Sequence, residues 1–137
     1  MERTFIDLGL PSGILWAIRP LKGKYSHSEA MKLPAQYGLP DCHLPSLEEI
    51  RELIEHCSCY SNQIIGPSED QIFVPLSATM EEIYLFWSKD NALGNDGKPL
   101  EDCDQAIYFG VNFNSNVIDF DATGKDYKMY VLLCKSK

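Results

Sequence analysis

The chain has 137 residues, a formal net charge of −8 and 45% hydrophobic residues. This length and composition fit one globular domain covering residues 1–137, and they are too apolar for a disordered chain. The acidic balance makes nucleic acid a poor partner, because binding to phosphates requires clustered Lys and Arg. The apolar runs are far shorter than the roughly 20 residues of a membrane-spanning helix, so we expect a soluble protein without a membrane span.

The N-terminal residues and the cysteines bear on the cellular compartment. Residues 1–9 carry several charges and no apolar stretch, so they do not have the pattern of a signal peptide. The default location is therefore cytoplasmic, unless an export signal has been removed. The irregular spacing of the five cysteines argues against a closed disulfide framework and favours free thiols, with one disulfide as the alternative. These cysteines are Cys42, Cys57, Cys59, Cys103 and Cys134.

A first capped helix is expected to begin near Ser26. Ser26 and Glu29 have the spacing of a capping box, in which each side chain bonds the backbone amide of the other residue. The expected buried positions follow at helical spacing and are Ala30, Leu33 and Tyr37. Pro34 lies inside this pattern, and because proline has no amide proton we expect a short or kinked helix.

A second capped helix is expected to begin at Ser46. Ser46 and Glu49 repeat the capping box directly after Pro45. An apolar stripe at helical spacing follows, consisting of Leu47, Ile50, Leu53, Ile54 and Cys57. The charged residues fall mainly on the other side, so this helix should pack on a core through one face.

The rest of the chain shows the alternation and the turn residues of β-strands. Expected strands cover residues 4–7, 14–17, 72–74, 85–88, 106–113, 117–120 and 127–135. Residues 114–116, Asn-Ser-Asn, suit the turn of a hairpin, because asparagine tolerates a positive φ. Helices come early and strands late, which indicates an α+β fold rather than an alternating α/β fold.

Three segments resemble a known family. Residues 7–17 (DLGLPSGILWA) match its opening, an acidic-Leu-Gly-Leu-Pro-Ser-Gly turn that leads into a Leu-Trp-Ala strand. Residues 42–50 (CHLPSLEEI) are similar to its Trp-Arg-Leu-Pro-Thr motif with an acidic helix start, and residues 86–88 (FWS) to its Tyr-Trp-Ser segment. Over nearly its whole length, the chain thus resembles the Fibrobacter succinogenes major paralogous domain family.

The resemblance implies a C-type-lectin-like fold, in which two helices flank a curled antiparallel β-sheet with long loops on one side. The family is related to the C-terminal domain of Legionella collagen-like proteins. Its members are typically exported or surface proteins of gut Bacteroidetes, and most have no assigned activity, so the resemblance implies a fold and little chemistry. Two family arginines are replaced in this chain, one by His43 and one in the apolar region around Leu132.

Neither calcium nor zinc is expected to be bound. Calcium-dependent sugar binding needs oxygen ligands from an acidic-Pro-Asn loop, which the chain lacks, and the acidic loop 90–104 does not follow the EF-hand spacing. Cys57 and Cys59, with Cys42 and His43 nearby in sequence, are possible zinc ligands. Their spacing, however, is not that of common zinc sites. We therefore expect no metal and no cofactor, and loop 90–104 is the first place to look for any other ligand.

The sequence contains no recognisable catalytic motif. Its histidines are His27, His43 and His56, and no Gly-x-Ser-x-Gly nucleophile elbow accompanies them. A catalytic pair of a cysteine with His43 or His56 can be imagined, but the presence of both residue types in the chain is its only support. We therefore expect a protein that is not an enzyme, and we keep a thiol or histidine enzyme as an alternative.

The expected binding residues are tyrosines, amides and carboxylates of the late strands and of the acidic loop. Tyr108 and Tyr130 should lie on the face opposite Phe109 and Val131, because side chains alternate along a strand. The predicted ligand-binding set is Tyr108, Asn112, Asn114, Tyr130, Asp90, Asn91 and Asp96.

Aromatic and amide groups suit sugars and protein surfaces. We therefore predict a non-enzymatic binding module that recognises a glycan or a protein partner through the loop face of a lectin-like domain. The alternative is a small structural or assembly domain of a surface or phage-like particle. The oligomeric state is left open by the sequence.

Overall fold

The computed structural model describes residues 5–60, 63–73 and 83–136. Within these residues the chain is α+β, as the order of the sequence motifs predicted, with two helices and ten strands. The elements in chain order are β1 (Phe5–Asp7), β2 (Leu15–Ala17), α1 (His27–Gln36), β3 (Cys42–His43), α2 (Leu47–His56), β4 (Ser58–Tyr60), β5 (Gln63–Ile65), β6 (Gln71–Phe73), β7 (Ile83–Asn91), β8 (Gln105–Asn112), β9 (Val117–Gly124) and β10 (Cys134–Lys135).

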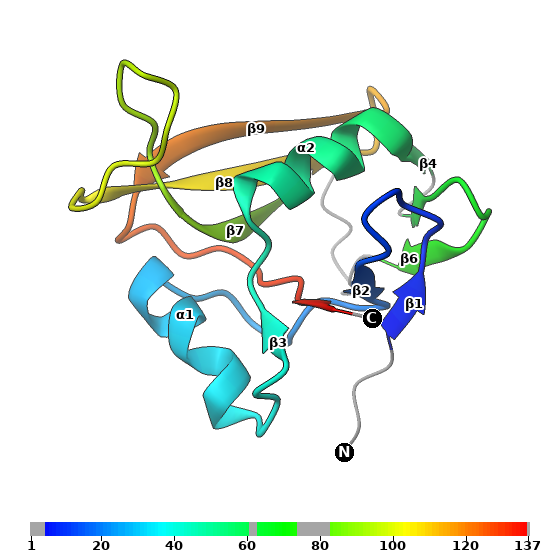
Figure 1. The fold of residues 1–137 in the computed structure, drawn as a ribbon, viewed down its shortest axis with the longest axis horizontal. Helices are drawn as coiled ribbons and strands as arrows, with labels where there is room; N and C mark the ends of the chain where they lie inside the picture. The colour runs from blue at the N-terminus through cyan, green and yellow to red at the C-terminus, as the bar shows by residue number, and fades with distance from the viewer. Residues whose placement is uncertain (1–4, 61–62, 74–82, 137) are drawn as a thin grey trace.

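The strands form three small antiparallel sheets, whereas the family resemblance implied a single curled sheet. Their strand orders are β1-β2-β10-β3, β4-β5-β6 and β7-β8-β9. In the first sheet, β10 lies between β2 and β3, so the end of the chain is held between two early segments. Figure 1 shows α2 lying across the long β7-β8-β9 sheet, while α1 lies beside β3.

The sheet β7-β8-β9 turns its aromatic face toward α2. Phe86, Phe109 and Phe120 stand opposite one another across the three strands, and the rings of Phe86 and Phe109 stack with centroids 5.0 Å apart. The guanidinium of Arg51, on α2, lies 5.6 Å from the centroid of the Phe120 ring. Stacked aromatic pairs of this kind add about 0.5–1.5 kcal/mol to the burial of their area.

Helix α2 forms as the sequence predicts. Ser46 is the N-cap, and both hydrogen bonds of its capping box with Glu49 are present. Of the apolar stripe, Leu47, Ile50 and Leu53 are buried, and Ile54 and Cys57 are half-buried. Burying one Leu or Ile side chain contributes about 1.5–3 kcal/mol, so this face anchors the helix on the core.

Helix α1 also begins with the predicted capping box, at Ser26, and it ends two residues after Pro34, as a short helix. Its end is a Schellman motif: the amide of Gly38 donates to Ala35 O over 3.1 Å, and that of Leu39 to Pro34 O over 2.7 Å. Gly38 adopts the left-handed φ of 68° that this motif requires. The prediction that Tyr37 belongs to the buried face was wrong, because Tyr37 is the C-cap and is 45% exposed.

The predicted β8–β9 hairpin is present, whereas the predicted final strand is not. Strands β8 and β9 are joined by the predicted turn, in which Asn116 has a φ of 59°. A final strand over 127–135 was wrong, because only β10 is regular there. The preceding residues bond to two different segments instead: Leu133 O accepts from Ala17 N, and the amide of Tyr130 donates to Leu85 O in β7. The predicted strand residues 4 and 74 lie outside the described residues.

The packing of the described residues produces one hydrophobic cluster, which includes Trp16, Trp87, Phe86, Phe109 and the apolar segment 131–133. Both helices and all three sheets contribute side chains to it. None of the helices among the described residues has the length and apolar character needed to cross a membrane.

Candidate functional site

The opening segment, residues 7–14, folds into a closed turn that docks on α2. Asp7 Oδ1 accepts a hydrogen bond from the amide of Gly9 over 2.9 Å, and the amide of Gly13 donates to Leu10 O over 2.9 Å. Leu8 and Leu10 are buried and fix the turn to the core. The residues that carry the family resemblance therefore hold this turn in place.

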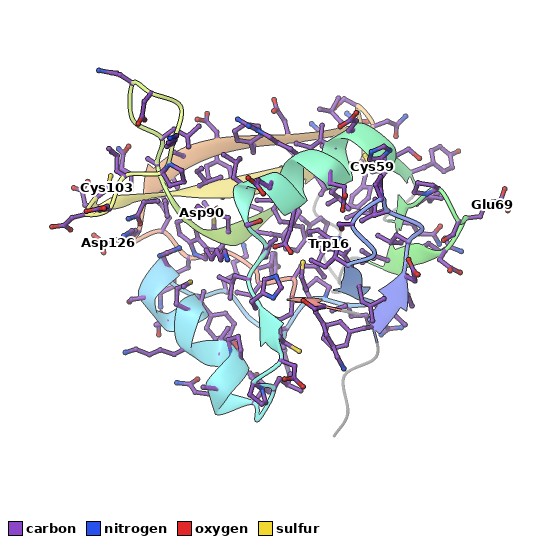
Figure 2. All side chains as sticks on the ribbon, in the orientation of Figure 1. Trp16, Cys59, Glu69, Asp90, Cys103 and Asp126 are labelled. Carbon is purple, nitrogen blue, oxygen red and sulfur yellow. The ribbon has the colours of Figure 1, made fainter. Side chains whose placement is uncertain are left out.

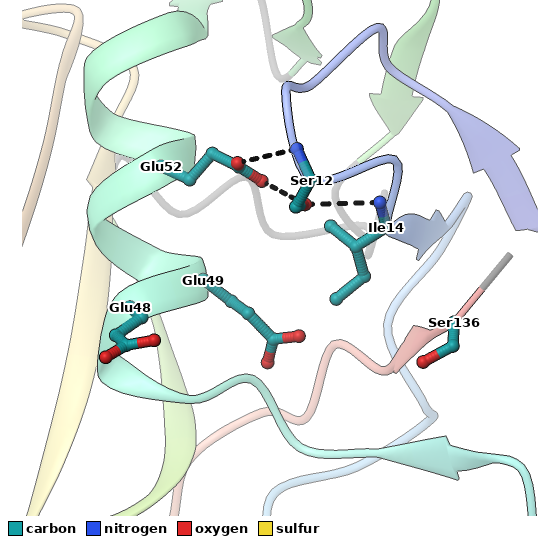
Figure 3. A pocket seen from close by; sticks show the side chains of 6 residues that line it. All are labelled: Ser12, Ile14, Glu48, Glu49, Glu52 and Ser136. Carbon is teal, nitrogen blue, oxygen red and sulfur yellow. Dashed lines mark hydrogen bonds between the residues drawn. The ribbon is translucent and has the colours of Figure 1, made fainter.

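Ser12 links the opening turn to α2. Its amide donates to Glu52 Oε2 over 3.0 Å, and its hydroxyl donates to Glu52 Oε1 over 2.6 Å. Beside this contact lies a cleft of about 320 Å³, shown in Figure 3. It is lined by Ser12, Ile14, Glu48, Glu49, Glu52 and Ser136. We call it the acidic cleft, because three carboxylates of α2 form one of its walls.

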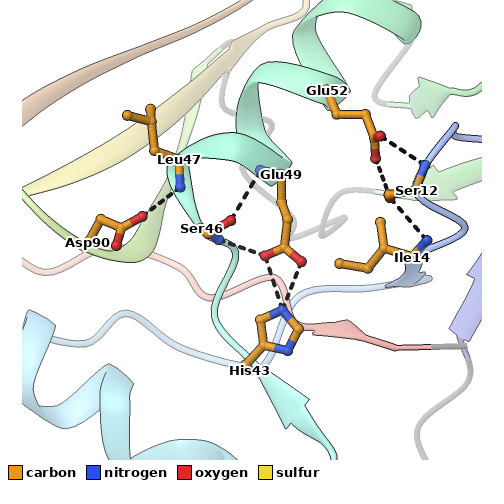
Figure 4. A network of polar contacts seen from close by, with 8 residues as sticks. All are labelled: Ser12, Ile14, His43, Ser46, Leu47, Glu49, Glu52 and Asp90. Carbon is orange, nitrogen blue, oxygen red and sulfur yellow. Dashed lines mark hydrogen bonds and ion pairs between the residues drawn. The ribbon is translucent and has the colours of Figure 1, made fainter. Parts of the chain in front are cut away.

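Glu49 connects the acidic cleft to a polar contact behind it. His43 Nε2 lies 3.0 Å from both carboxylate oxygens of Glu49, and the amide of Ser46 donates to Glu49 Oε1 over 2.7 Å (Figure 4). Burial would by itself raise the pKa of Glu49. The hydrogen bonds from His43 and Ser46 outweigh this effect and hold its pKa below the usual range.

Cys134 completes this polar contact from the neighbouring strand. Cys134 stands directly opposite His43 in the β10–β3 pairing and opposite Trp16 in the β10–β2 pairing. One ligand atom each from His43, Glu49 and Cys134 lies within 4.8 Å of the others. Burial raises the pKa of the Cys134 thiol well above its usual value, and the nearby charge of Glu49 adds to this shift. We call these three residues the His–Glu–Cys cluster.

Sequence reasoning missed the His–Glu–Cys cluster. His43 and Glu49 are six residues apart, and a signal for their contact existed: a histidine at the family's arginine position, shortly before a capping-box glutamate. Cys134 gave no such signal, because its position opposite His43 depends on how β10 pairs with β3. Of the residues that the sequence analysis considered for zinc, His43 belongs to this cluster, whereas Cys42, Cys57 and Cys59 do not.

Asp90 supports the fold at the N-terminus of α2, in the same turn as Glu49. The register of β7 shifts between Trp87 and Asn91, and this irregularity brings Asp90 to the start of α2. Asp90 Oδ2 accepts a hydrogen bond from the amide of Leu47 over 2.7 Å (Figure 4). A carboxylate at a helix N-terminus also interacts favourably with the helix dipole. Asp90, predicted to bind a ligand, thus holds the first turn of α2.

The other loop residues of the predicted binding set make local contacts. Asn91 Nδ2 donates to Leu100 O over 2.7 Å and closes the base of the loop 92–104. Asp96 Oδ1 accepts from the amide of Lys98 over 3.1 Å within a turn. In the described part of the chain, no three carboxylates of loop 90–104 converge on one point as metal ligands would.

The outer face of the β7-β8-β9 sheet, on the side away from α2, carries a second group of predicted residues. We call it the open sheet face and define it by three cross-strand rows. The rows contain Ile83, Asn112 and Val117, then Leu85, Gly110 and Asp119, then Tyr108 and Asp121, the last two beside the buried Trp87. Ile83 and Val117 are 50% and 47% exposed, which is high for aliphatic side chains in a sheet.

The prediction for Tyr108 was confirmed, because Tyr108 lies on the face opposite Phe109, whereas the prediction that Tyr130 shares this face was wrong. Tyr108 lies on the open sheet face, where burial and then the charges of Asp121 and Asp119 raise the pKa of its phenol. Tyr130 pairs in parallel with Phe86, outside the antiparallel ladder, and its ring centroid lies 6.2 Å from that of Phe86. Tyr130 therefore belongs to the opposite, aromatic side of the sheet.

The two predicted asparagines lie at the β8–β9 hairpin. Asn112 Oδ1 accepts hydrogen bonds from the amides of Asn114 and Ser115, over 3.0 and 3.1 Å, and so stabilises the turn. Asn114 is exposed at the tip of the hairpin. The structure thus brings Asn112 and Tyr108 onto one face, with Asn114 next to it, and leaves the rest of the predicted set elsewhere.

The other thiols and histidines of the described chain do not belong to the His–Glu–Cys cluster. All five cysteines are free, as the spacing predicted, and burial raises the pKa of the Cys57 thiol to about 12. His27 is buried, with its Nε2 2.9 Å from Ser88 O, and burial lowers its pKa. His56 is exposed at the end of α2. Of the three histidines, His43 alone belongs to a group of potential metal ligands within the described chain.

Comparisons of the chain with protein-family models, with curated proteins and with solved structures found no match. The resemblance of residues 7–17 to the Fibrobacter succinogenes major paralogous domain family therefore stays a prediction. The open sheet face, the acidic cleft and the His–Glu–Cys cluster are the features from which a function of this α+β chain can be inferred.

Proposed function

We propose that the chain is a non-enzymatic binding module that docks a protein partner on the open sheet face. The observation that carries the proposal is the row of Ile83, Asn112 and Val117, in which two aliphatic side chains are about half exposed, at 50% and 47%. Clustered exposed apolar side chains mark interaction surfaces, because their burial by a partner is favourable. The sheet below them is paired on both sides of β8 and offers a rigid support.

The charges on the β9 side of this row indicate the chemistry of a partner that docks there, whereas Lys24 and Lys128 line a cavity with Ile83 and Leu85 on the β7 side. Asp119 and Asp121 are exposed and alternate along β9, next to Leu85 and Tyr108. The chain as a whole has a net charge of −8, which attracts cationic partners over a distance. A segment that combines aliphatic side chains with Lys or Arg would match both features. A glycan would match them less well, since branched aliphatic side chains do not offer the flat ring on which a sugar stacks.

The outer edge of the sheet favours docking through side chains over the addition of a strand. Asp119 Oδ1 accepts from the amide of Phe120, and Asp121 Oδ1 from the amide of Ala122, both over 2.8 Å. Two amide donors of the edge strand β9 are therefore already occupied, and an incoming strand would have to displace both carboxylates. The face of the sheet remains the more accessible surface.

We further propose that the domain is C-type-lectin-like and related to the family that residues 7–17 resemble. Two helices packed with antiparallel sheets support this fold, and so do the roles of Asp7 and Ser12 in closing and docking the opening turn. A thiol enzyme has less support. Cys134, which lies beside His43, is fully buried and has a raised pKa, so it does not present an exposed thiolate that could attack a substrate.

Selection of a random peptide library on the immobilised protein tests the proposed function. We expect enriched peptides to contain Lys or Arg together with Leu, Ile or Val. The variant Val117→Lys should lose most of this binding, because it places a charge in the aliphatic row. The matched control is Leu100→Lys, which changes another exposed aliphatic residue, 43% exposed in the acidic loop, and should leave binding unchanged.

Three outcomes would contradict the proposal. The first is the absence of peptide enrichment, and the second is enrichment that Leu100→Lys removes as fully as Val117→Lys does. The third is specific binding on a glycan array that Val117→Lys abolishes, since it would make the open sheet face a sugar site. Self-association that depends on Val117, measured by sedimentation, would instead assign this face to assembly and would also overturn the proposed partner.

A further inference from the structure

The His–Glu–Cys cluster brings together three kinds of metal ligand from different parts of the chain. An imidazole nitrogen of His43, a carboxylate oxygen of Glu49 and the sulfur of Cys134 lie within 4.8 Å of one another. Ligand atoms around a tetrahedral Zn²⁺ are about 3–4 Å apart, given bond lengths of roughly 2.0–2.3 Å. The observed arrangement therefore needs only small side-chain rotations to surround a single ion.

The backbone fixes these ligands before any ion arrives. His43 and Cys134 are directly opposed across the antiparallel β3–β10 pair, so both side chains leave the sheet on the same side. Glu49 is the third residue of α2, and its Oε1 is held by the amide of Ser46 over 2.7 Å. Its Oε2 lies 3.0 Å from His43 Nε2, with no other hydrogen-bond partner assigned to it among the described residues. Two ligands are thus on a sheet and one is on a capped helix, which limits their movement.

The mixture of donor atoms selects the kind of cation. Calcium and magnesium prefer sets of oxygen ligands, whereas Zn²⁺ takes imidazole, thiolate and carboxylate ligands in one site. The cluster also holds a thiol and a carboxylate close together. A divalent cation stabilises both a thiolate and a carboxylate, so it would suit this pair of groups.

The acidic cleft offers an entry path to the cluster. Glu49 lines the cleft, and the side chains of His43 and Glu49 are 33% and 20% exposed, while Cys134 is buried. An ion would therefore approach from the side of His43 and Glu49 and meet the sulfur last. The charges of Glu48 and Glu52 on the same wall would raise the local concentration of cations.

A buried donor lies in the same cross-strand row as the sulfur. Trp16 stands opposite Cys134 in the β2–β10 pair, and Figure 2 shows it near the centre of the molecule. Its indole nitrogen Nε1 is buried and has no hydrogen-bond partner among the described residues. An unpaired buried donor costs about 1–3 kcal/mol. The indole N–H is a donor only, so Trp16 cannot itself be a ligand of the ion.

We propose that His43, Glu49 and Cys134 bind one Zn²⁺ ion, with a fourth position open to a water molecule from the acidic cleft. Binding replaces the S–H bond of Cys134 by a metal–sulfur bond and releases that proton to solvent. The imidazole of His43 binds in its neutral form, and the ion takes the place of the Nε2 proton that lies between His43 and Glu49. A neutral imidazole keeps this proton on Nδ1, and an imidazolium releases it to solvent. The inference is independent of the proposed partner on the open sheet face.

Titration of the reduced 137-residue chain with Co²⁺, followed by absorption spectroscopy, tests the proposal. A thiolate ligand gives a sulfur-to-cobalt charge-transfer band in the near ultraviolet, and tetrahedral coordination gives intense visible bands. We expect both, with displacement of Co²⁺ by Zn²⁺ and not by Mg²⁺ or Ca²⁺. Binding should also release protons, which can be measured in weakly buffered solution.

Four variants assign the ligands. Cys134→Ser should abolish the charge-transfer band, whereas Cys42→Ser, which changes a buried cysteine on the neighbouring strand, should retain it. His43→Gln should weaken binding by about 100-fold or more, since even residues that only orient a metal ligand are worth about 10–100-fold. The matched control His56→Gln changes an exposed histidine and should bind as the unchanged protein does.

Folding of each variant is checked by near-ultraviolet circular dichroism, because Cys134 is fully buried. If Cys134→Ser does not fold, His43→Gln at its partly exposed position decides the question. Absence of the charge-transfer band in the unchanged protein would overturn the proposal. So would a band that folded Cys134→Ser retains, a band that Cys42→Ser loses, or equal affinities for His43→Gln and His56→Gln.

Discussion

The two helices begin with the same motif and use it differently. At α1, Glu29 is exposed, and the hydrogen bonds of its side chain within the described chain go to Ser26 of the same capping box. At α2, Glu49 has the same place in its capping box and also contacts His43, over 3.0 Å. A capping box thus determines where a helix begins, while its tertiary neighbours decide whether its glutamate becomes part of a polar site.

The largest expected effect comes from removing the two capping-box glutamates. Glu49→Ala should lower the free energy of unfolding by about 2 kcal/mol, because it removes the cap bond and leaves His43 without its carboxylate partner. Glu29→Ala should cost clearly less, because its bonds are local and exposed. Urea unfolding in the presence of a metal chelator measures both. Equal losses would show that the contact with His43 adds nothing to the cap.

The second expected effect concerns the other support of α2. Asp90→Ala should destabilise the chain by about 1 kcal/mol, because the amide of Leu47 loses its acceptor at the helix N-terminus. The matched control is Asp96→Ala in the same loop region, whose bond is to the nearby amide of Lys98. In thermal unfolding, the melting temperature of Asp90→Ala should be clearly lower than that of Asp96→Ala. A control variant as unstable as Asp90→Ala would refute the special role of Asp90.

The third expected effect is a pH dependence that Glu49 causes. Its pKa in the folded chain lies below the ordinary value of 4.5, so the unfolded chain takes up the proton first as the pH falls. The stabilisation is therefore complete above the ordinary value and is lost progressively below it. Urea midpoints measured from about pH 6 to pH 3 should fall more steeply for the unchanged protein than for Glu49→Gln. Parallel curves would contradict the assignment.

The smallest expected effect is a pH dependence that His27 causes. His27 is the first residue of α1 and contacts Ser88 O in β7. Burial lowers the pKa of His27, its hydrogen bond to Ser88 O opposes this, and the charges of Lys125 and Asp90 act in opposite directions. The unfolded chain therefore binds the proton first as the pH falls below 6.5, and stability is lost from there downward. His27→Asn should flatten the stability profile in this range. An unchanged slope would show that His27 is not held neutral.

Local sequence patterns predicted the local features of the fold. The capping boxes of both helices and the turn at Asn116 follow from residues a few positions apart, and all of them are present. The pairing of Cys134 with His43 could not be predicted, because it depends on where β10 lies between two strands from the other end of the chain. Apolar composition alone could not show that residues 127–133 bond to two segments rather than to one strand.

The candidate site was predicted less well than the fold, for a related reason. Polar residues in a loop suggest a ligand-binding site, but the side chains of Asn91 and Asp96 form hydrogen bonds to backbone groups of the loop itself. Of the residues that converge, Glu49 belongs to a helix start and His43 and Cys134 to two short strands, so their contact depends on how these elements pack. Convergence of polar groups is a property of tertiary packing, which single-sequence patterns do not encode.

The carboxylates on the edge strand β9 also have a consequence for how the chain reaches its folded state. Asp119 and Asp121 each bond the amide of the very next residue, so these contacts can form as soon as the β8–β9 hairpin does. No distant segment has to arrive first. The hairpin therefore carries its own protection against pairing with other unfolded chains from its earliest moments, when a newly made protein is most prone to aggregate.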